Sequence, residues 1–365
     1  MRIADIISVL EDFAPVSLKE TYDNVGLLTG MPQWNCTGVL CTLDATEDVI
    51  KEAVERNCNL VVAHHPIIFG GLKRINGNNY VEKAVIAAIK NDVSIYAIHT
   101  NLDNVLSGVN KIIADKLGLL HTSVLLEKED ILKKLFTFVP VTHLEKVRDA
   151  IFTAGGGEIG NYAECSFSVQ GTGTFKGMKG ATPFVGEVGT RHTENEMKVE
   201  VIYPAWLETR IISAMIKAHP YEEVGHDIVF LNNKYQKTGS GLIGELPDFV
   251  DEMTFLKHIQ KVFGLKLIRH SPFMGKKVKK VAVCGGAGSF LISKALSVGA
   301  DFYITADVKY HEFFDANSQM VIADIGHFES EQFTIDLLAE LLVQKFPTFA
   351  VLKSVIKTNP IQYFT

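Results

Sequence analysis

The sequence lacks long apolar stretches, and its first residues lack the pattern of a secretory signal. A membrane-spanning helix needs roughly 18 or more consecutive apolar residues, and no segment of this 365-residue chain reaches that length. The opening MRIADIISVLEDFAP carries acidic residues and no signal-peptide cleavage pattern. We therefore expect a cytoplasmic protein with no membrane partner.

Cysteine is scarce, and its spacing excludes two common uses of this residue. The chain has five cysteines, an odd number, and no C-x-x-C pair. Neither a disulfide framework nor a thiolate zinc site is indicated by such a pattern. We expect reduced, mostly buried thiols at Cys36, Cys41, Cys58, Cys165 and Cys284.

The chain also lacks an excess of positive charge. It has 36 Lys and Arg against 42 Asp and Glu, a net charge of −6, which argues against an extended surface for the phosphate backbone of nucleic acid. The hydrophobic content of 47% and charged content of 21% are typical of a globular protein. With glycines between the apolar runs, this composition favours the α/β class.

The first third of the chain predicts alternating strands and helices. A strand is expected over GVLCTLD (38–44), a helix from Thr46, and a second strand over NLVVAHH (59–65), whose short apolar run is typical of a strand covered on both faces. A further helix is expected over 80–90, and a third strand over VSIYAIHTNLD (93–103) that ends in Asp103.

The last third repeats this order, which indicates a duplication of a βαβ-containing unit. Strands are expected over KVAVCGGAG (280–288), ADFYITAD (300–307) and MVIADIGH (320–327), with a helix over 289–299. The middle of the chain instead predicts alternating strands and two amphipathic helices, at 143–152 and 208–218. We expect a duplicated α/β outer domain with mainly parallel sheets (1–124 and 239–365), interrupted by a small α+β, ferredoxin-like insert (125–238).

Ligand-type side chains follow the expected strands. His64 and His65 precede Pro66, which interrupts the strand and allows both imidazoles to converge on one edge of the sheet. The sites of open α/β sheets lie at this edge, beyond the carboxyl ends of the strands. His327 and Glu331 are four residues apart, so on a helix they lie on one face.

Together with Asp103, these residues predict a site for two metal ions. Imidazole nitrogens bind zinc, iron or manganese, and a carboxylate can bridge two such ions. Each feature alone also fits a hydrogen-bonded loop or a solvated pair, and their joint placement favours metal. Lys309 and His311 follow another strand and are candidates for proton transfer or anion binding, although a surface helix start explains them equally well.

Six motifs occur in an order that resembles the NIF-three-like family, also called GTP cyclohydrolase I type 2 homologues. They are YDNVGLLTG (22–30), AHHPIIF (63–69), IHTNLDN (98–104), GGAGSFL (285–291), TADVKYHEFFDA (305–316) and GHFESE (326–331). The central stretch with AHPYEEVGHDI (218–228) resembles the PII- or CutA-like insert of longer bacterial members. Ala306 stands where many relatives have glycine.

The resemblance implies a dinuclear metal centre in protomers that assemble as a toroidal homohexamer. The ligands that it implies are His64, His65, Asp103, His327 and Glu331. The cyclohydrolase label is a name and identifies no substrate. We expect two divalent ions, of zinc, iron or manganese, that support hydrolysis of a nucleotide-like or other small phosphate- or amide-containing substrate; the alternative is a non-catalytic metal-binding or regulatory scaffold with a ligand-sensing insert.

Overall fold

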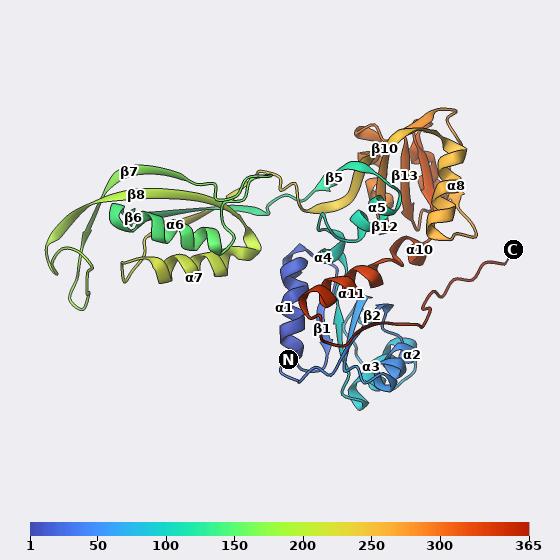
Figure 1. Ribbon diagram of the computed structural model, residues 1–365, viewed down its shortest axis with the longest axis horizontal. Helices are drawn as coiled ribbons and strands as arrows, with labels where there is room; N and C mark the ends of the chain where they lie inside the picture. Colours follow the sequence, from blue (N-terminus) through green and yellow to red (C-terminus); the bar gives the residue numbers. More distant parts are fainter. Residues whose placement is uncertain (365) are drawn as a thin grey trace. The chain divides into compact units, whose positions relative to one another are not determined.

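The computed structural model describes residues 1–364 and divides into two compact units (Figure 1). The first unit comprises Met1–Glu127 and Lys237–Thr365, and the second comprises Lys128–Gln236. Within residues 1–364, no helix has the length and apolar character needed to cross a membrane. The fold is a mixed α/β fold with parallel and antiparallel sheets.

The amino-terminal part of the first unit is built on a five-stranded sheet with the order β1-β4-β3-β2-β15. Its strands are β1 (Gly26–Thr29), β2 (Val39–Asp44), β3 (Leu60–His65), β4 (Ser94–Ala97) and β15 (Val351–Lys353). All neighbouring strands run parallel except β1, which is antiparallel to β4. Parallel strands covered on both faces need apolar residues at nearly every position, and β2, β3 and β4 are buried along almost their whole length.

Helices cover both faces of this sheet (Figure 1). They are α1 (Ile3–Phe13), α2 (Glu47–Glu55), α3 (Tyr80–Lys90) and, from the end of the chain, α11 (Thr334–Lys345). The short elements η1 (Val16–Leu18) and α4 (Thr100–Asp103) contact each other, and α5 (Val109–Lys116) packs against the second sheet of the unit. Helix α2 begins after Thr46, whose side chain accepts a hydrogen bond from the backbone N–H of Val49 at 3.4 Å. Helices α2 and α3 pack with β2, β3 and β4 in one apolar core.

The second sheet of this unit has the order β11-β14-β13-β12-β10-β5. Its elements are β5 (Leu120–Glu127), β10 (Gly239–Asp251), α8 (Glu252–Phe263), β11 (Arg269–His270), β12 (Lys277–Ala287), η4 (Ser289–Leu291), α9 (Ile292–Ser297), β13 (Phe302–Ala306), η5 (Tyr310–Ala316), β14 (Val321–Asp324) and α10 (His327–Glu331). Only β12, β13 and β14 are parallel neighbours among the described residues. The expectation of mainly parallel sheets is therefore wrong for this half, because β5, β10 and β11 add antiparallel partners.

The second unit is a four-stranded antiparallel sheet with two helices. Its elements are β6 (Leu132–Pro140), η2 (Val141–His143), α6 (Leu144–Thr153), β7 (Phe167–Lys176), β8 (Arg191–Pro204), η3 (Ala205–Leu207), α7 (Glu208–Ala218) and β9 (His226–Leu231), with the strand order β7-β8-β6-β9. Alternate residues of β6 and β8, among them Leu135, Val139, Val199 and Val201, pack with α6 and α7 in a core of their own. The period of two along each strand places these residues on one face.

Two expected elements differ in detail. The strand expected over 93–103 ends at Ala97, and Asp103 lies in the short helix α4. There the side chain of Asn101 accepts a hydrogen bond from the backbone N–H of His99 at 3.0 Å, and this local bond competes with continuation of the strand. The helix expected from His327 onward is divided into α10 and α11.

The buried carboxylate of Glu52, in helix α2, binds the segment that follows β15. Its substitution tests how much this contact stabilises the first unit. Glu52 accepts hydrogen bonds from Ser354 Oγ at 2.5 Å and from the backbone N–H of Val355 at 3.0 Å, and it pairs with Arg56 at 2.6 Å. Burial alone would raise the pKa of Glu52, but these partners hold it below its ordinary value.

We expect Glu52→Gln to lower the melting temperature of the first unit by about 2–4 °C near neutral pH. The folded-state pKa lies below the unfolded one, so the stabilisation is present above the unfolded value of 4.5 and disappears as the pH falls through the folded value. Calorimetry from neutral to acidic pH measures the difference, and the exposed Glu55→Gln on the same helix is the control. A difference that does not change with pH would contradict this role for the charge.

Candidate metal centre

The end of β3 presents two histidines that are oriented by different partners. His64 is fully buried, and its Nδ1 is 2.9 Å from the carbonyl oxygen of Ile98. Donation from Nδ1 to this carbonyl leaves Nε2 as the ring atom with a free lone pair. That Nε2 atom is buried and has no hydrogen-bond partner within residues 1–364. Its free lone pair suits it to bind a metal ion.

His65 is held by the neighbouring strand. Its Nδ1 lies 2.8 Å from Oδ1 of Asp44 at the end of β2, and the other oxygen of Asp44 accepts a hydrogen bond from Thr358 Oγ1 at 2.5 Å. A carboxylate on Nδ1 fixes the ring and directs Nε2 to the opposite side. Burial alone would lower the pKa of His65, but Asp44 and Glu331 raise it to about 9.

Helix α10 supplies two more ligand-type residues, His327 and Glu331. His327 Nδ1 lies 2.7 Å from Asp307 Oδ2, so a carboxylate orients this ring as Asp44 orients that of His65. Burial would lower the pKa of His327, but Asp307 and Glu331 raise it to about 11. Glu331 follows one turn later and is buried. Its pKa would rise with burial, but hydrogen bonds from His327 and His65, together with the nearby His64 ring, hold it well below its ordinary value.

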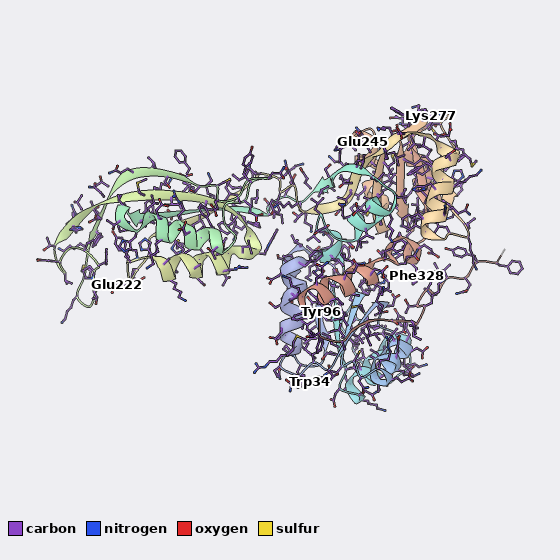
Figure 2. All side chains as sticks on the ribbon, in the orientation of Figure 1. Trp34, Tyr96, Glu222, Glu245, Lys277 and Phe328 are labelled. Carbon is purple, nitrogen blue, oxygen red and sulfur yellow. The ribbon has the colours of Figure 1, made fainter. Side chains whose placement is uncertain are left out.

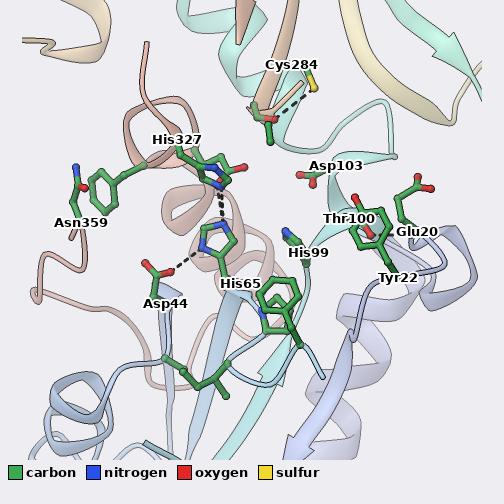
Figure 3. A pocket seen from close by; sticks show the side chains of 18 of the residues that line it. Glu20, Tyr22, Asp44, His65, His99, Thr100, Asp103, Cys284, His327 and Asn359 are labelled. Carbon is green, nitrogen blue, oxygen red and sulfur yellow. Dashed lines mark hydrogen bonds and ion pairs between the residues drawn. The ribbon is translucent and has the colours of Figure 1, made fainter. Parts of the chain in front are cut away.

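Three of these side chains, those of His65, His327 and Glu331, converge on one point. Figure 3 shows two of them, His65 and His327, facing each other. His65 Nε2 lies 2.9 Å from Glu331 Oε2, His327 Nε2 lies 3.2 Å from the same oxygen, and the two Nε2 atoms are 3.3 Å apart. Ligands about 2.0–2.1 Å from a tetrahedral zinc ion are separated by about 3.3 Å. The triad of His65, His327 and Glu331 would therefore be able to hold one metal ion.

Asp103 lies on the other side of Glu331. His64 Nε2 is 3.7 Å from Asp103 Oδ1 and 3.7 Å from Glu331 Oε1. Burial, together with the negative charge of Glu331, raises the pKa of Asp103 well above its ordinary value. A cation between Asp103 and Glu331 would stabilise both carboxylates as anions. All five ligand-type residues expected from the sequence thus lie around one space.

Close approach of the backbone makes room for the central carboxylate. Gly286, in β12, has a φ of +62°, and a Cβ added there would lie 2.3 Å from Glu331 Oε1. The adjacent Gly285 donates its N–H to Asn110 Oδ1 at 2.9 Å. Gly286 therefore allows the backbone of β12 to pack closely against Glu331.

The structure does not bring Lys309 and His311 to this space. Both are exposed at the start of η5, and neither lines the pocket described below. The backbone N–H of Lys309 donates to Glu312 Oε2 at 2.7 Å, and the His311 ring contacts Tyr310 and Phe314. Their placement is that of a surface helix start, the alternative explanation of this segment.

His99 is a site residue outside the ligand set expected from the sequence. Its ring centroid lies 5.2 Å from that of His64 and 5.4 Å from that of His65. Asp23 accepts from its Nδ1 at 2.9 Å and from the N–H of Thr100 at 3.0 Å. Burial would raise the pKa of Asp23, but these bonds lower it strongly. Asp23 lies in the motif YDNVGL and His99 in the motif IHTNLDN. The two motifs were therefore the sequence signal for this pair.

The cluster opens into a pocket of about 500 Å³ within the first unit. Its lining combines the ligand-type residues with aromatic and apolar side chains: Tyr22, Ile67, Phe69, Tyr80, Phe290, Phe328, Pro360 and Ile361. No lysine or arginine lines the pocket in the part of the chain that the structure describes. Apart from a bound metal and the histidines, the pocket offers an anionic ligand no positively charged side chain.

Known proteins similar to this chain agree with the motif resemblance. A family model described as Duf34/NIF3 (NGG1p interacting factor 3) matches residues 1–360. The chain is 39% identical over 371 residues to a protein of Halalkalibacterium halodurans named GTP cyclohydrolase 1 type 2 homolog, with 100% of both chains covered. A Bacillus subtilis protein of the same name is 40% identical, with 88% of this chain and 87% of the relative covered.

Solved structures show the same relationship. A Bacillus cereus protein described as related to NIF3 has a TM-score of 0.88 and 38% sequence identity, over 100% of this chain and 99% of the other. A Staphylococcus aureus protein has a TM-score of 0.77 and 28% identity, over 100% and 99%. The resemblance based on the six motifs is therefore confirmed.

Proposed function

The chain belongs to the Duf34/NIF3 family, and we propose that it is a hydrolase that depends on two divalent metal ions held by His64, His65, Asp103, His327 and Glu331. The observation that carries the proposal is the orientation of Glu331. Its Oε2 faces His65 and His327 at 2.9 and 3.2 Å, while its Oε1 faces His64 at 3.7 Å. One oxygen of Glu331 thus faces His65 and His327, and the other faces His64, as expected of a carboxylate that bridges two metal ions.

A pair of such ions, typically about 3.5–4 Å apart, activates water and stabilises negative charge that develops on the substrate. The chain's own residues supply the remaining functions. Asp44 and Asp307 fix the rings of His65 and His327 through Nδ1. His99 lines the pocket and is oriented by Asp23, so its Nε2 can accept a proton from water or donate one to a leaving group.

The pocket favours the amide-containing class of substrate over the phosphate-containing class. The aromatic side chains Tyr22, Phe69 and Phe290 and the absence of lysine and arginine from the described lining suit a neutral planar ring. A polyphosphate would place several negative charges beside Asp103 and Glu331 with only the metals to offset them. We therefore propose hydrolysis of a cyclic amide or a related nitrogen heterocycle.

The experiment is a hydrolysis panel on protein reconstituted with zinc, manganese or ferrous iron, with cyclic amides, nucleotides and phosphoesters as substrates. We expect metal-dependent turnover of a cyclic amide, and His99→Ala should lower kcat at least about tenfold, as for a lost proton-transfer group, with unchanged metal content. His311→Ala is the comparison. If His311→Ala lowers kcat and His99→Ala does not, the proton-transfer role belongs to His311.

Inactivity of the fully metallated protein towards every class in the panel would favour the second candidate, a metal-binding or regulatory scaffold with a ligand-sensing insert. A second pocket, in the Lys128–Gln236 unit, supports that candidate. The same family resemblance supports three further proposals: a homohexamer, a duplicated outer domain, and a PII- or CutA-like inserted domain over 125–238. Sedimentation analysis tests the hexamer directly.

A further inference from the structure

The unit Lys128–Gln236 contains a pocket of about 710 Å³ at the tip of the β7–β8 hairpin, separate from the metal centre. Its lining includes Phe138, Phe175, Phe184, Glu196 and Tyr221. In Figure 2, Glu222, which also lines it, lies at the end of the unit where the hairpin curls. The volume is typical of small-molecule sites, which combine apolar walls with a few converging polar groups.

Alternating glycines in β7 open this space. Gly171 pairs with Glu196 of β8, and Val169 pairs with Lys198, so these side chains share one face of the hairpin. A Cβ on Gly171 would have no atom within 4 Å, whereas one on Gly173 would lie 2.1 Å from Glu196 Oε2. The absence of a side chain at Gly171 therefore keeps the pocket open. The absence of one at Gly173 makes room for the carboxylate of Glu196.

Glu196 is the polar anchor of the pocket. It is only 8% exposed, although it carries a carboxylate. Tyr221 donates its hydroxyl hydrogen to Oε1 at 2.8 Å, and no hydrogen bond reaches Oε2 from residues 1–364. A largely buried carboxylate with one oxygen open to the pocket is stabilised when a cation or a hydrogen-bond donor approaches that oxygen. Burial and Glu196 raise the pKa of Tyr221, so the hydroxyl remains a donor.

The charges around the pocket favour a positively charged ligand. Lys198 also lines the wall, but its Nζ is bound to Glu200 Oε1 at 2.9 Å and lies over the Phe136 ring. Lys176 is exposed, and two exposed carboxylates, those of Glu222 and Glu223, line the same pocket. Glu196 is thus the one charged group of the lining that is both buried and without a cationic partner in the described chain.

Aromatic rings complete the site. The Tyr221 ring centroid lies 6.0 Å from that of Phe175 and 6.2 Å from that of Phe184. Faces of such rings attract an ammonium group and pack against an apolar body. We propose that this pocket binds a small organic amine, whose ammonium group pairs with Glu196 and whose aromatic or branched apolar group contacts Phe138, Phe175 and Tyr221.

The proposal does not depend on the metal centre, and its test uses the full chain with and without metal. Calorimetric titration compares 2-phenylethylamine with the neutral 2-phenylethanol and the anionic 3-phenylpropionate. We expect the amine to bind at least about tenfold more tightly than either analogue, a difference of about 1.4 kcal/mol. Removal of metal should not change its affinity.

Glu196→Gln should weaken binding of the amine about tenfold or more and leave that of 2-phenylethanol unchanged. Gly171→Leu should prevent binding by filling the hollow, and the exposed Glu187→Gln on the β7–β8 loop is the matched control. The proposal is wrong if the amine binds no better than the alcohol or if Glu196→Gln binds it equally. It is also wrong if no amine binds and Gly171→Leu changes the oligomer mass, because a second copy of the chain would then occupy the pocket.

Discussion

Replacing Glu331 with alanine should remove both metal ions from the protein. The variant loses the Oε2 atom that completes the triad with His65 and His327 and the Oε1 atom that faces His64. The remaining histidines would then have to hold ions in a buried space without the carboxylate that offsets their charge. Loss of a shared ligand affects both positions, whereas loss of a ligand to one ion leaves the other in place.

Elemental analysis after reconstitution with a divalent metal measures the effect. Wild-type protein should contain close to two ions per chain, and Glu331→Ala should contain almost none. Glu329→Ala is the matched control, because Glu329 lies in the same helix and accepts hydrogen bonds from Asn359 and Tyr363. We expect this control to keep both ions.

Glu331→Gln preserves the side-chain volume and separates the loss of charge from the loss of packing. Circular dichroism should show that both Glu331 variants are folded. A folded Glu331→Ala protein that retains one ion would limit Glu331 to a single position. One that retains two would exclude it as the bridging ligand.

Local patterns were sufficient to predict the strands and the convergence of most of the proposed ligands. The apolar runs before Asp44 and His65 predict β2 and β3, and Pro66 predicts the end of β3, because these signals act within a few residues. The spacing of His327 and Glu331 likewise predicts their common face on α10. Asp103 was correctly expected near them, although it lies on a helix.

The orientation of the ligands was not predictable from local signals. Asp44 and Asp307 each hold a histidine about twenty residues away, and the pairing depends on which strands become neighbours. The placement of Lys309 and His311 depends on the turn that precedes them. They follow a strand end as ligands do, but Asp307 has a φ of +54° and η5 begins at once, so the chain turns both side chains to the surface.

Excision of Lys128–Gln236 should leave the metal centre intact and abolish amine binding completely. All five proposed metal ligands and every residue that lines their pocket lie in the first unit. The residues at the junction are direct neighbours: Glu127 of β5 pairs with Gly239 of β10 in an antiparallel ladder. A short loop can therefore close β5 and β10 into a hairpin.

The position of the joint matters because the segment before β10 contacts the chain next to Asp103. The backbone N–H of Leu106 donates to the carbonyl of Lys237 at 2.9 Å, and the N–H of Gly239 donates to that of Asn104 at 2.8 Å. The variant should therefore keep Lys237 and Thr238 and connect Glu127 to Lys237 through Gly-Ser, which gives a loop of about four residues, a common hairpin length.

Metal analysis and calorimetric titration with 2-phenylethylamine compare the excised protein with the full chain, which serves as the control. We expect the same metal content per chain and no amine binding, because the first unit contains both βαβ segments and its own core. Sedimentation shows whether the central unit also supports assembly. A folded, soluble excised protein without metal would show that residues 128–236 help to build the metal site. Metal binding and amine binding would then not be independent functions of two units.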